Sequence, residues 1–448
     1  MPCILPSIIT KAGNKLKIKQ ALLYRNDIIL RQSYAMFAVL WAAFEKATNL
    51  TPNKQYFGQG ESLARALVGM CYAWLVDHEA NKNLDAITRV NWLLQTITLP
   101  KYHEKYIYHW SSMWISGTIA YIRLMAEDIL TTETKNNIDN MLKIECDRMV
   151  EILNHIEEDP LAFVDMKYWM SYDGDKEAVR AKQRISLLGS VLDSWIIDTK
   201  AEETAGRARV LSMCGNLYGR SDYIDAAKVF ASVTFAHEQV IYGVSITNVT
   251  KDLVVYNHGY GPNYAYAIAA LYGIAEAHFS FIVADQPAPP EIIYGQECRD
   301  VYTRNVTDIT YPSDCHINLF LLQGNQENIT HEHDPEVRWL SGDLRYSLAL
   351  LPCYALVADS ATQDNVICDM AKIVSCLSND LTWMPSYVEC LPSETNLTDR
   401  TINHLIQNVE HYSQVAYKWL VFEKMVKRNK LFETLDGWLR GKLQGNKI

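Results

Sequence analysis

Apolar residues recur at three- and four-residue spacings along most of this chain of 448 residues. That spacing is typical of amphipathic helices that bury one face, whereas strand-like alternation is limited to residues 239–246 and 317–322. Helices joined by short polar turns favour stacked antiparallel hairpins, and the lack of a repeat of fixed period disfavours a simple solenoid. The pattern predicts helices over residues 16–48, 60–77, 84–98, 112–130, 133–157, 179–197, 200–217, 222–239, 263–283, 341–360, 363–378, 401–427 and 430–443.

One long stretch, residues 285–343, departs from this periodicity. It begins with Gln-Pro-Ala-Pro-Pro and continues with scattered polar residues, and irregular stretches of this length are usually functional. Helical patterns of the same character resume after it. The sequence therefore predicts a single helical domain over residues 1–448, with an irregular excursion across one of its faces.

The composition argues against two classes of partner. A net charge of −10 disfavours nucleic acid, which would need a basic face. No segment reaches the roughly 18 uncharged apolar residues of a membrane span. The N-terminal apolar run is broken by Pro6 and lacks a basic region, so it does not resemble a secretory signal. Localisation stays open, because Asn-x-Thr sequons compatible with secretion occur at Asn49, Asn248, Asn305, Asn328 and Asn396.

The ten cysteines and twelve histidines show no spacing that indicates a metal. The cysteines are expected to be buried thiols, with a Cys298–Cys315 disulfide as an alternative. His331 and His333 form a His-x-His pair without a third ligand in pattern. No metal and no cofactor is predicted.

The most informative loop runs from Val254 to Tyr264 and reads Val-Val-Tyr-Asn-His-Gly-Tyr-Gly-Pro-Asn-Tyr. Pro262 suits the first position of the helix that follows. The loop therefore presents an amide, an imidazole and phenols beside a helix N-terminus, where an anion is favoured. The alternative, without a functional role, is an aromatic turn in which Asn257 and Gly259 supply unusual backbone angles.

Separated segments, taken in order, resemble the (α/α) toroid proteins of the heparinase II/III-like and related polysaccharide-lyase-like group. Residues 198–203, Asp-Thr-Lys-Ala-Glu-Glu, resemble the opening of a central helix of that group. Asn257-His258 followed by Pro262-Asn263-Tyr264 resembles its Asn-His and Pro-x-Tyr pair. Residues 322–327 stand where the group has a Pro-x-Gly-x-Asp-Trp loop, and residues 109–114 resemble a Trp-rich helix start.

The chain departs from that group in ways that mark a divergent member. No Trp follows Ala-Glu-Glu, the Asp-Trp of the last loop is absent, and the chain ends in helical patterns. The resemblance, which covers about residues 60–360, implies an all-α fold of antiparallel helical hairpins forming an (α/α) toroid, an incomplete barrel without a C-terminal β-sandwich.

The resemblance also implies a lyase that cleaves an acidic, uronate-containing glycan by β-elimination. Asn257 and His258 would neutralise the substrate carboxylate so that the neighbouring carbon can lose its proton. Tyr260, or else Tyr264, would take that proton and return one to the leaving oxygen. Further contacts to the substrate are expected from His109, Trp110, Glu202, Gln323, Asn325 and Arg338.

Two other functions remain open from the sequence. A glycoside hydrolase on the same toroid needs two carboxylates, for which Glu202, Asp252 and Asp343 are candidates. Against that role, Thr199 and Glu202 match a capping box that would explain Glu202 structurally. The third hypothesis is a repurposed or non-catalytic toroid that binds or acts on a small molecule, such as a secondary metabolite.

Overall fold

The computed structural model describes residues 56–98, 112–156, 183–186, 188–192, 200–255 and 264–307, together with Gln414, Tyr417, Lys418 and Val421. This part of the chain is mostly helical, as the periodicity predicts. The helices are α2 (Tyr56–Asn81), α3 (Asp85–Ile97), α5 (Ser112–Met125), α6 (Thr132–Ile156), α9 (Ala201–Tyr218), α10 (Ser221–Val233), α11 (Tyr264–Val283) and α12 (Gln296–Tyr302). Single helical turns are η1 (Glu127–Ile129), η2 (Pro290–Ile292) and η3 (Thr303–Thr307).

Two small antiparallel hairpins accompany the helices: β1 (Gln183–Ser186) with β2 (Gly189–Leu192), and β3 (Gln239–Ile241) with β4 (Val244–Ile246). The second hairpin was expected from its alternation, and it turns through Tyr242 and Gly243, both with positive φ. The first corrects a prediction, because residues 179–197 were expected to be helical. Gly189 has a φ of 150° in this hairpin, which no helix accommodates.

Helices α5, α9 and α11 form an inner layer and run parallel. The rings of Trp114 on α5 and Tyr272 on α11 stack, and so do those of Tyr121 and Phe279, each seven residues later on its helix. Asn216 of α9 donates to the hydroxyl of Ser280 on α11 at 2.9 Å. Every residue from Ala201 to Gly215 is buried, as expected of a helix covered on all sides.

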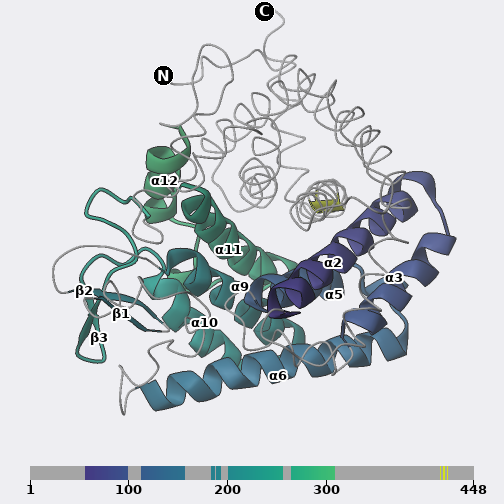
Figure 1. Ribbon diagram of the computed structural model, residues 1–448, viewed down its shortest axis with the longest axis horizontal. Coiled ribbons are helices and arrows are strands. Elements are labelled where there is room, and N and C mark those ends of the chain that lie inside the picture. The colour runs from purple at the N-terminus through teal and green to yellow at the C-terminus, as the bar shows by residue number, and fades with distance from the viewer. Residues whose placement is uncertain are drawn as a thin grey trace, which may run out of the picture.

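Helices α6 and α10 lie outside this layer and run antiparallel to α5 and α9 (Figure 1). Ser112 at the start of α5 meets Glu145 near the end of α6, whereas Arg123 near the end of α5 meets Asp139 earlier in α6. Helix α6 has buried positions at helical spacing and exposed residues between them. These five helices therefore form two layers, an inner one that is largely buried on all sides and an outer one that is amphipathic.

Glycines allow the inner helices to approach closely. A Cβ on Gly273 of α11 would lie 2.8 Å from the backbone and Cβ of Ala205 on α9. A Cβ on Gly206 would likewise lie 2.7 Å from Met113 of α5. Helix α9 then ends at Gly219, whose φ of 64° is the left-handed conformation that commonly closes a helix.

The predicted irregular excursion is partly wrong. Residues 285–307 contain η2, α12 and η3, and Ile292, Tyr294 and Val301 among them are buried. These apolar residues fold back on α10 and α11 because the segment has enough of them to anchor short helices. The predicted helix over residues 222–239 also ends earlier, at Val233. Residues 308–343 lie outside the described residues, and the single-domain prediction remains a prediction.

Candidate functional site

Most of the sequence-predicted site residues lie outside the described residues: Asn257, His258, Tyr260, His109, Trp110, Gln323, Asn325 and Arg338. Tyr264 is the first residue of α11, and Glu202 lies in the first turn of α9. Asp252, a carboxylate proposed for hydrolysis, lies exposed in a turn, where its N–H donates to the Thr250 hydroxyl at 3.2 Å. Asp343 and the His331–His333 pair lie outside the described part of the chain.

Three of the described helices share one direction. Because α5, α9 and α11 are parallel, their starts at Ser112, Ala201 and Tyr264 face the same end of the inner layer. In the sequence, His109 and Trp110 precede the start of α5, and the Asn257–Tyr264 segment leads into α11. Candidate segments that are far apart in the sequence therefore border helix starts of one orientation.

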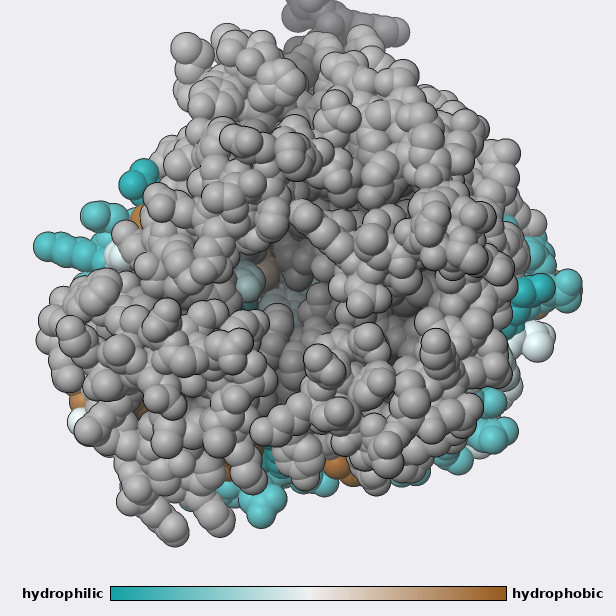
Figure 2. All heavy atoms as spheres, in the orientation of Figure 1, coloured by the Kyte–Doolittle hydropathy of each residue, from teal (hydrophilic) through white to brown (hydrophobic). Residues whose placement is uncertain are grey.

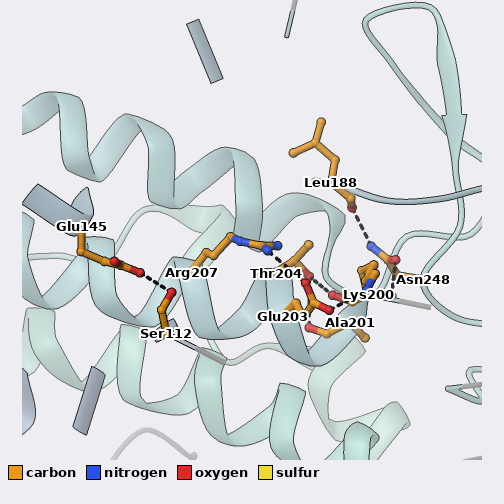
Figure 3. A network of polar contacts seen from close by, with 9 residues as sticks. All are labelled: Ser112, Glu145, Leu188, Lys200, Ala201, Glu203, Thr204, Arg207 and Asn248. Carbon is orange, nitrogen blue, oxygen red and sulfur yellow. Dashed lines mark hydrogen bonds and ion pairs between the residues drawn. The ribbon is translucent and has the colours of Figure 1, made fainter. Parts of the chain in front are cut away.

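A buried polar network occupies the start of α9 (Figure 3). The Nζ atom of Lys200 lies 2.6 Å from Oε1 of Glu203, and Nη2 of Arg207 donates to Oε2 of the same carboxylate at 3.0 Å. Burial opposes ionisation of Glu203, but the two cations outweigh it, so the pKa of its carboxyl is lowered. Lys200 and Arg207 thus hold Glu203 as a buried carboxylate at this helix start.

Glu145 of α6 lies on the other side of Arg207 in Figure 3. Burial raises the pKa of Glu145 to about 7, although the Ser112 hydroxyl, which donates to it at 2.6 Å, partly offsets that rise. A carboxyl with a pKa near neutrality is suited to general acid–base chemistry. The sequence carried one signal for it, since Glu145 falls on the same helical face as Leu142 and Met149, both buried.

Asn248 anchors the same end of α9. Its Oδ1 accepts the backbone N–H of Lys200 at 2.9 Å, and its Nδ2 donates to the carbonyls of Leu188 and Val233 at 2.9 and 2.7 Å. The capping-box prediction is therefore wrong for the observed helix start. The N-cap of α9 is Lys200, without a side-chain capping bond, and the distant Asn248 satisfies its N–H. Glu202 is buried rather than exposed to a ligand.

A second cluster of charged side chains lies deeper in the inner layer and combines Arg209, Tyr272, Glu276 and Lys418. Arg209 and Lys418 both pair with the carboxylate of Glu276, Lys418 at 2.6 Å from Oε1. Both also donate to the hydroxyl of Tyr272, Arg209 at 3.1 Å. All four side chains are buried. Sequence patterns missed this cluster, because its members come from three distant segments and no local motif joins them.

The described residues include no group of three or more His, Cys, Asp or Glu side chains placed to hold a metal. Four described cysteines are buried free thiols: Cys71, Cys146, Cys214 and Cys298. By length and hydropathy, residues 266–283 of α11 would suffice to cross a membrane, but 78% of that window is buried inside the protein. A core helix passes the same test, so this window is weak evidence for a span.

Comparisons with known proteins bring no relative to these observations: no family model, no curated protein and no solved structure matches the chain.

Proposed function

We propose that the chain is a carbohydrate-active lyase built as an incomplete (α/α) toroid, and that it cleaves an acidic, uronate-containing glycan by β-elimination. The observation that carries this proposal is the shared direction of α5, α9 and α11. Parallel inner helices with an antiparallel outer layer are what a toroid of helical hairpins requires. Two of the segments that the resemblance to polysaccharide lyases selects directly precede these helix starts in the sequence, at residues 109–110 and 257–263.

The electrostatics of that end suit a carboxylate substrate. The N-terminus of a helix has N–H groups without a partner inside the helix and a partial positive charge. It stabilises a nearby anion by about 0.3–1 kcal/mol. Lys200 and Arg207 place two cationic groups around Glu203 at the start of α9. Figure 2 shows hydrophilic described residues at the edges of this face, with a few hydrophobic ones beside them.

In the proposed mechanism, Asn257 and His258 donate hydrogen bonds to the substrate carboxylate. The bonds stabilise the enolate that forms when the adjacent carbon loses its proton. Tyr260 takes that proton, and a tyrosine hydroxyl, from Tyr260 or Tyr264, protonates the leaving glycosidic oxygen. His109, Trp110, Gln323, Asn325 and Arg338 are proposed to hold the glycan. Glu202 is left out of this set, because the elimination step gives a carboxylate of the protein no role.

The test is ultraviolet absorbance of the unsaturated uronate product while the purified protein is incubated with a panel of acidic polysaccharides. The absorbance should rise with the wild-type protein and stay flat with His258→Ala and Tyr260→Phe. Tyr242→Phe, a change at the exposed tip of the β3–β4 hairpin, is the matched control and should leave the rate unchanged. A flat trace for the wild-type protein on every substrate would reject elimination.

A glycoside hydrolase is the second candidate, and one observation favours it. Glu145 and Glu203, on either side of Arg207, have pKa values shifted in opposite directions. The raised pKa of Glu145 suits the acid that glycoside hydrolysis requires, whereas Glu203 stays ionised between Lys200 and Arg207. Reducing sugar released without ultraviolet absorbance, and lost in Glu145→Gln, would establish hydrolysis instead. If neither product forms, the third hypothesis remains, namely a toroid that binds a small molecule and does not cleave a glycan.

A further inference from the structure

The described residues near the C-terminus form one buried helical face. Gln414, Tyr417, Lys418 and Val421 follow the spacing of three, four and seven residues that places side chains on one side of a helix. All four are buried. The helix that the sequence predicts over residues 401–427 is confirmed at these positions. We refer to these four residues as the C-terminal face.

The C-terminal face packs against three different helices. Tyr417 meets the ring of Tyr72 on α2 edge to face, with 5.6 Å between the ring centres. The Nζ atom of Lys418 lies 4.9 Å from the ring centre of Tyr121 on α5 and 4.2 Å from that of Tyr272 on α11. It also pairs with Glu276 of α11. Docking of this face therefore depends on placing a lysine amine inside the inner layer.

The described charges around that amine do not balance if every one of these groups is ionised. Arg209 of α9 pairs with Glu276, and this pair is neutral by itself. Lys418 then adds a second cation to the same carboxylate, with no second carboxylate among its described contacts. Among the described residues, the phenols of Tyr72, Tyr121, Tyr272 and Tyr417 also face this centre. Burial, and after it the charges of Glu79 and Asp128, raise the pKa of Tyr417.

A buried net charge is expensive, so the centre is more stable when it gives up one proton. Burial and the positive charge of Arg209 both lower the pKa of Lys418 well below its usual value. The hydroxyl of Tyr272 contacts both Arg209 and Lys418. A proton can therefore pass between the amine and the phenol while the number of protons in the centre stays the same.

We propose that Lys418 and Tyr272 form a proton-dependent latch, in which docking of the C-terminal face releases one proton to solvent. When the C-terminal face is released, Lys418 would be a solvated ammonium with its usual pKa. When the face is docked, the centre would hold one proton fewer. Acid therefore favours release of the segment, and alkaline pH favours docking. The docking equilibrium should change by up to about tenfold per pH unit, as linkage of a single proton requires. This latch does not depend on the proposed lyase activity.

The experiment is hydrogen exchange of the full-length protein followed by mass spectrometry, between about pH 6 and about pH 9, with rates corrected for the intrinsic pH dependence of exchange. Peptides that contain residues 414–421 should open more readily at low pH, by up to about tenfold per pH unit. Peptides from α9, in the core of the inner layer, serve as the reference for global unfolding. Lys418→Met should remove the pH dependence, because methionine fills the site without a charge.

Lys228→Met is the matched control, since Lys228 pairs with Asp225 at the surface of α10. It should retain the wild-type pH dependence. Tyr272→Phe provides a second variant that keeps the ring and removes the hydroxyl, and it should shift the pH at which opening occurs. Opening that is independent of pH in the wild-type protein, or an unchanged pH slope in Lys418→Met, would overturn the latch.

Discussion

The backbone N–H of Lys200 donates to the side-chain oxygen of Asn248 at 2.9 Å, joining the start of α9 to a residue 48 positions later. The amide nitrogen of Asn248 reaches the Leu188 carbonyl before β2 and the Val233 carbonyl at the end of α10. One fully buried asparagine therefore fixes a hairpin, the end of one helix and the start of another. That start carries the network of Lys200 and Glu203.

Replacing Asn248 with Ala should destabilise the protein by about 2–4 kcal/mol, because one buried N–H and two buried carbonyls lose their partner. Chemical denaturation of the variant and the wild-type protein measures the difference in unfolding free energy. Asn154→Ala is the control, as Asn154 is exposed on α6. A loss at Asn248 no larger than at Asn154 would contradict the anchoring role.

The sequons at Asn248 and Asn305 should carry no glycan. Both asparagines are fully buried, and Nδ2 of Asn305 donates to the carbonyls of Leu253 and Val301 at 2.9 and 2.8 Å. A bulky glycan on either nitrogen would displace these bonds. Peptide mass mapping after expression in a host that glycosylates secreted proteins tests this. Natively folded protein with a glycan at Asn248 would refute it.

Gly273→Ala should destabilise the protein by about 1–3 kcal/mol, because the added Cβ would lie 2.8 Å from the backbone of Ala205 and push α9 and α11 apart. Thermal unfolding gives the comparison. Gly295→Ala is the matched control, since the nearest atom to its added Cβ lies at 3.6 Å. Equal stability of the two variants would mean that α9 and α11 tolerate a wider spacing.

Glu145→Gln should stabilise the protein at neutral and alkaline pH, by about 2–3 kcal/mol above pH 7. The pKa of Glu145 is raised from 4.5 to about 7 in the folded state, so the unfolded chain loses its proton first. Wild-type stability from this group therefore falls as the pH rises from 4.5 to about 7, and glutamine cannot ionise. Denaturation over a pH series measures the difference, with Glu151→Gln, exposed on the same helix, as control. A difference that does not vary with pH would reject the assignment.

His278 should make the protein less stable in acid. Burial lowers the pKa of its ring from 6.5 to about 4, and its Nδ1 accepts the backbone N–H of Tyr294 at 3.2 Å. The unfolded chain binds a proton first as the pH falls, so stability from this group is complete above 6.5 and is lost toward pH 4. The loss should be on the order of 2 kcal/mol. Stability of His278→Asn over the same pH range should lack this loss, and an unchanged acid slope would contradict it.

The long helices were predictable because their signal is local. Helices α3 and α6 follow three- and four-residue spacings that are visible without knowing their partners. The hairpin of β1 and β2 was missed because Ile185 and Val191 fit a helical pattern as well as a strand pattern. Its strand conformation depends on Gly189, where a Cβ would lie 2.5 Å from Asn248.

The sequence by itself determined the helical class and the approximate positions of most of the described helices, because these follow from periodicity and local chemistry. Only the tertiary structure decided which polar groups are buried and what they meet. The Asn-x-Thr triplet in the sequence does not show whether Asn248 is exposed or fully buried. Nothing near Lys418 in the chain records that burial shifts its pKa. Desolvation and pairing arise when α6, α9, α11 and the C-terminal face come together, and those contacts join residues separated by tens to hundreds of positions.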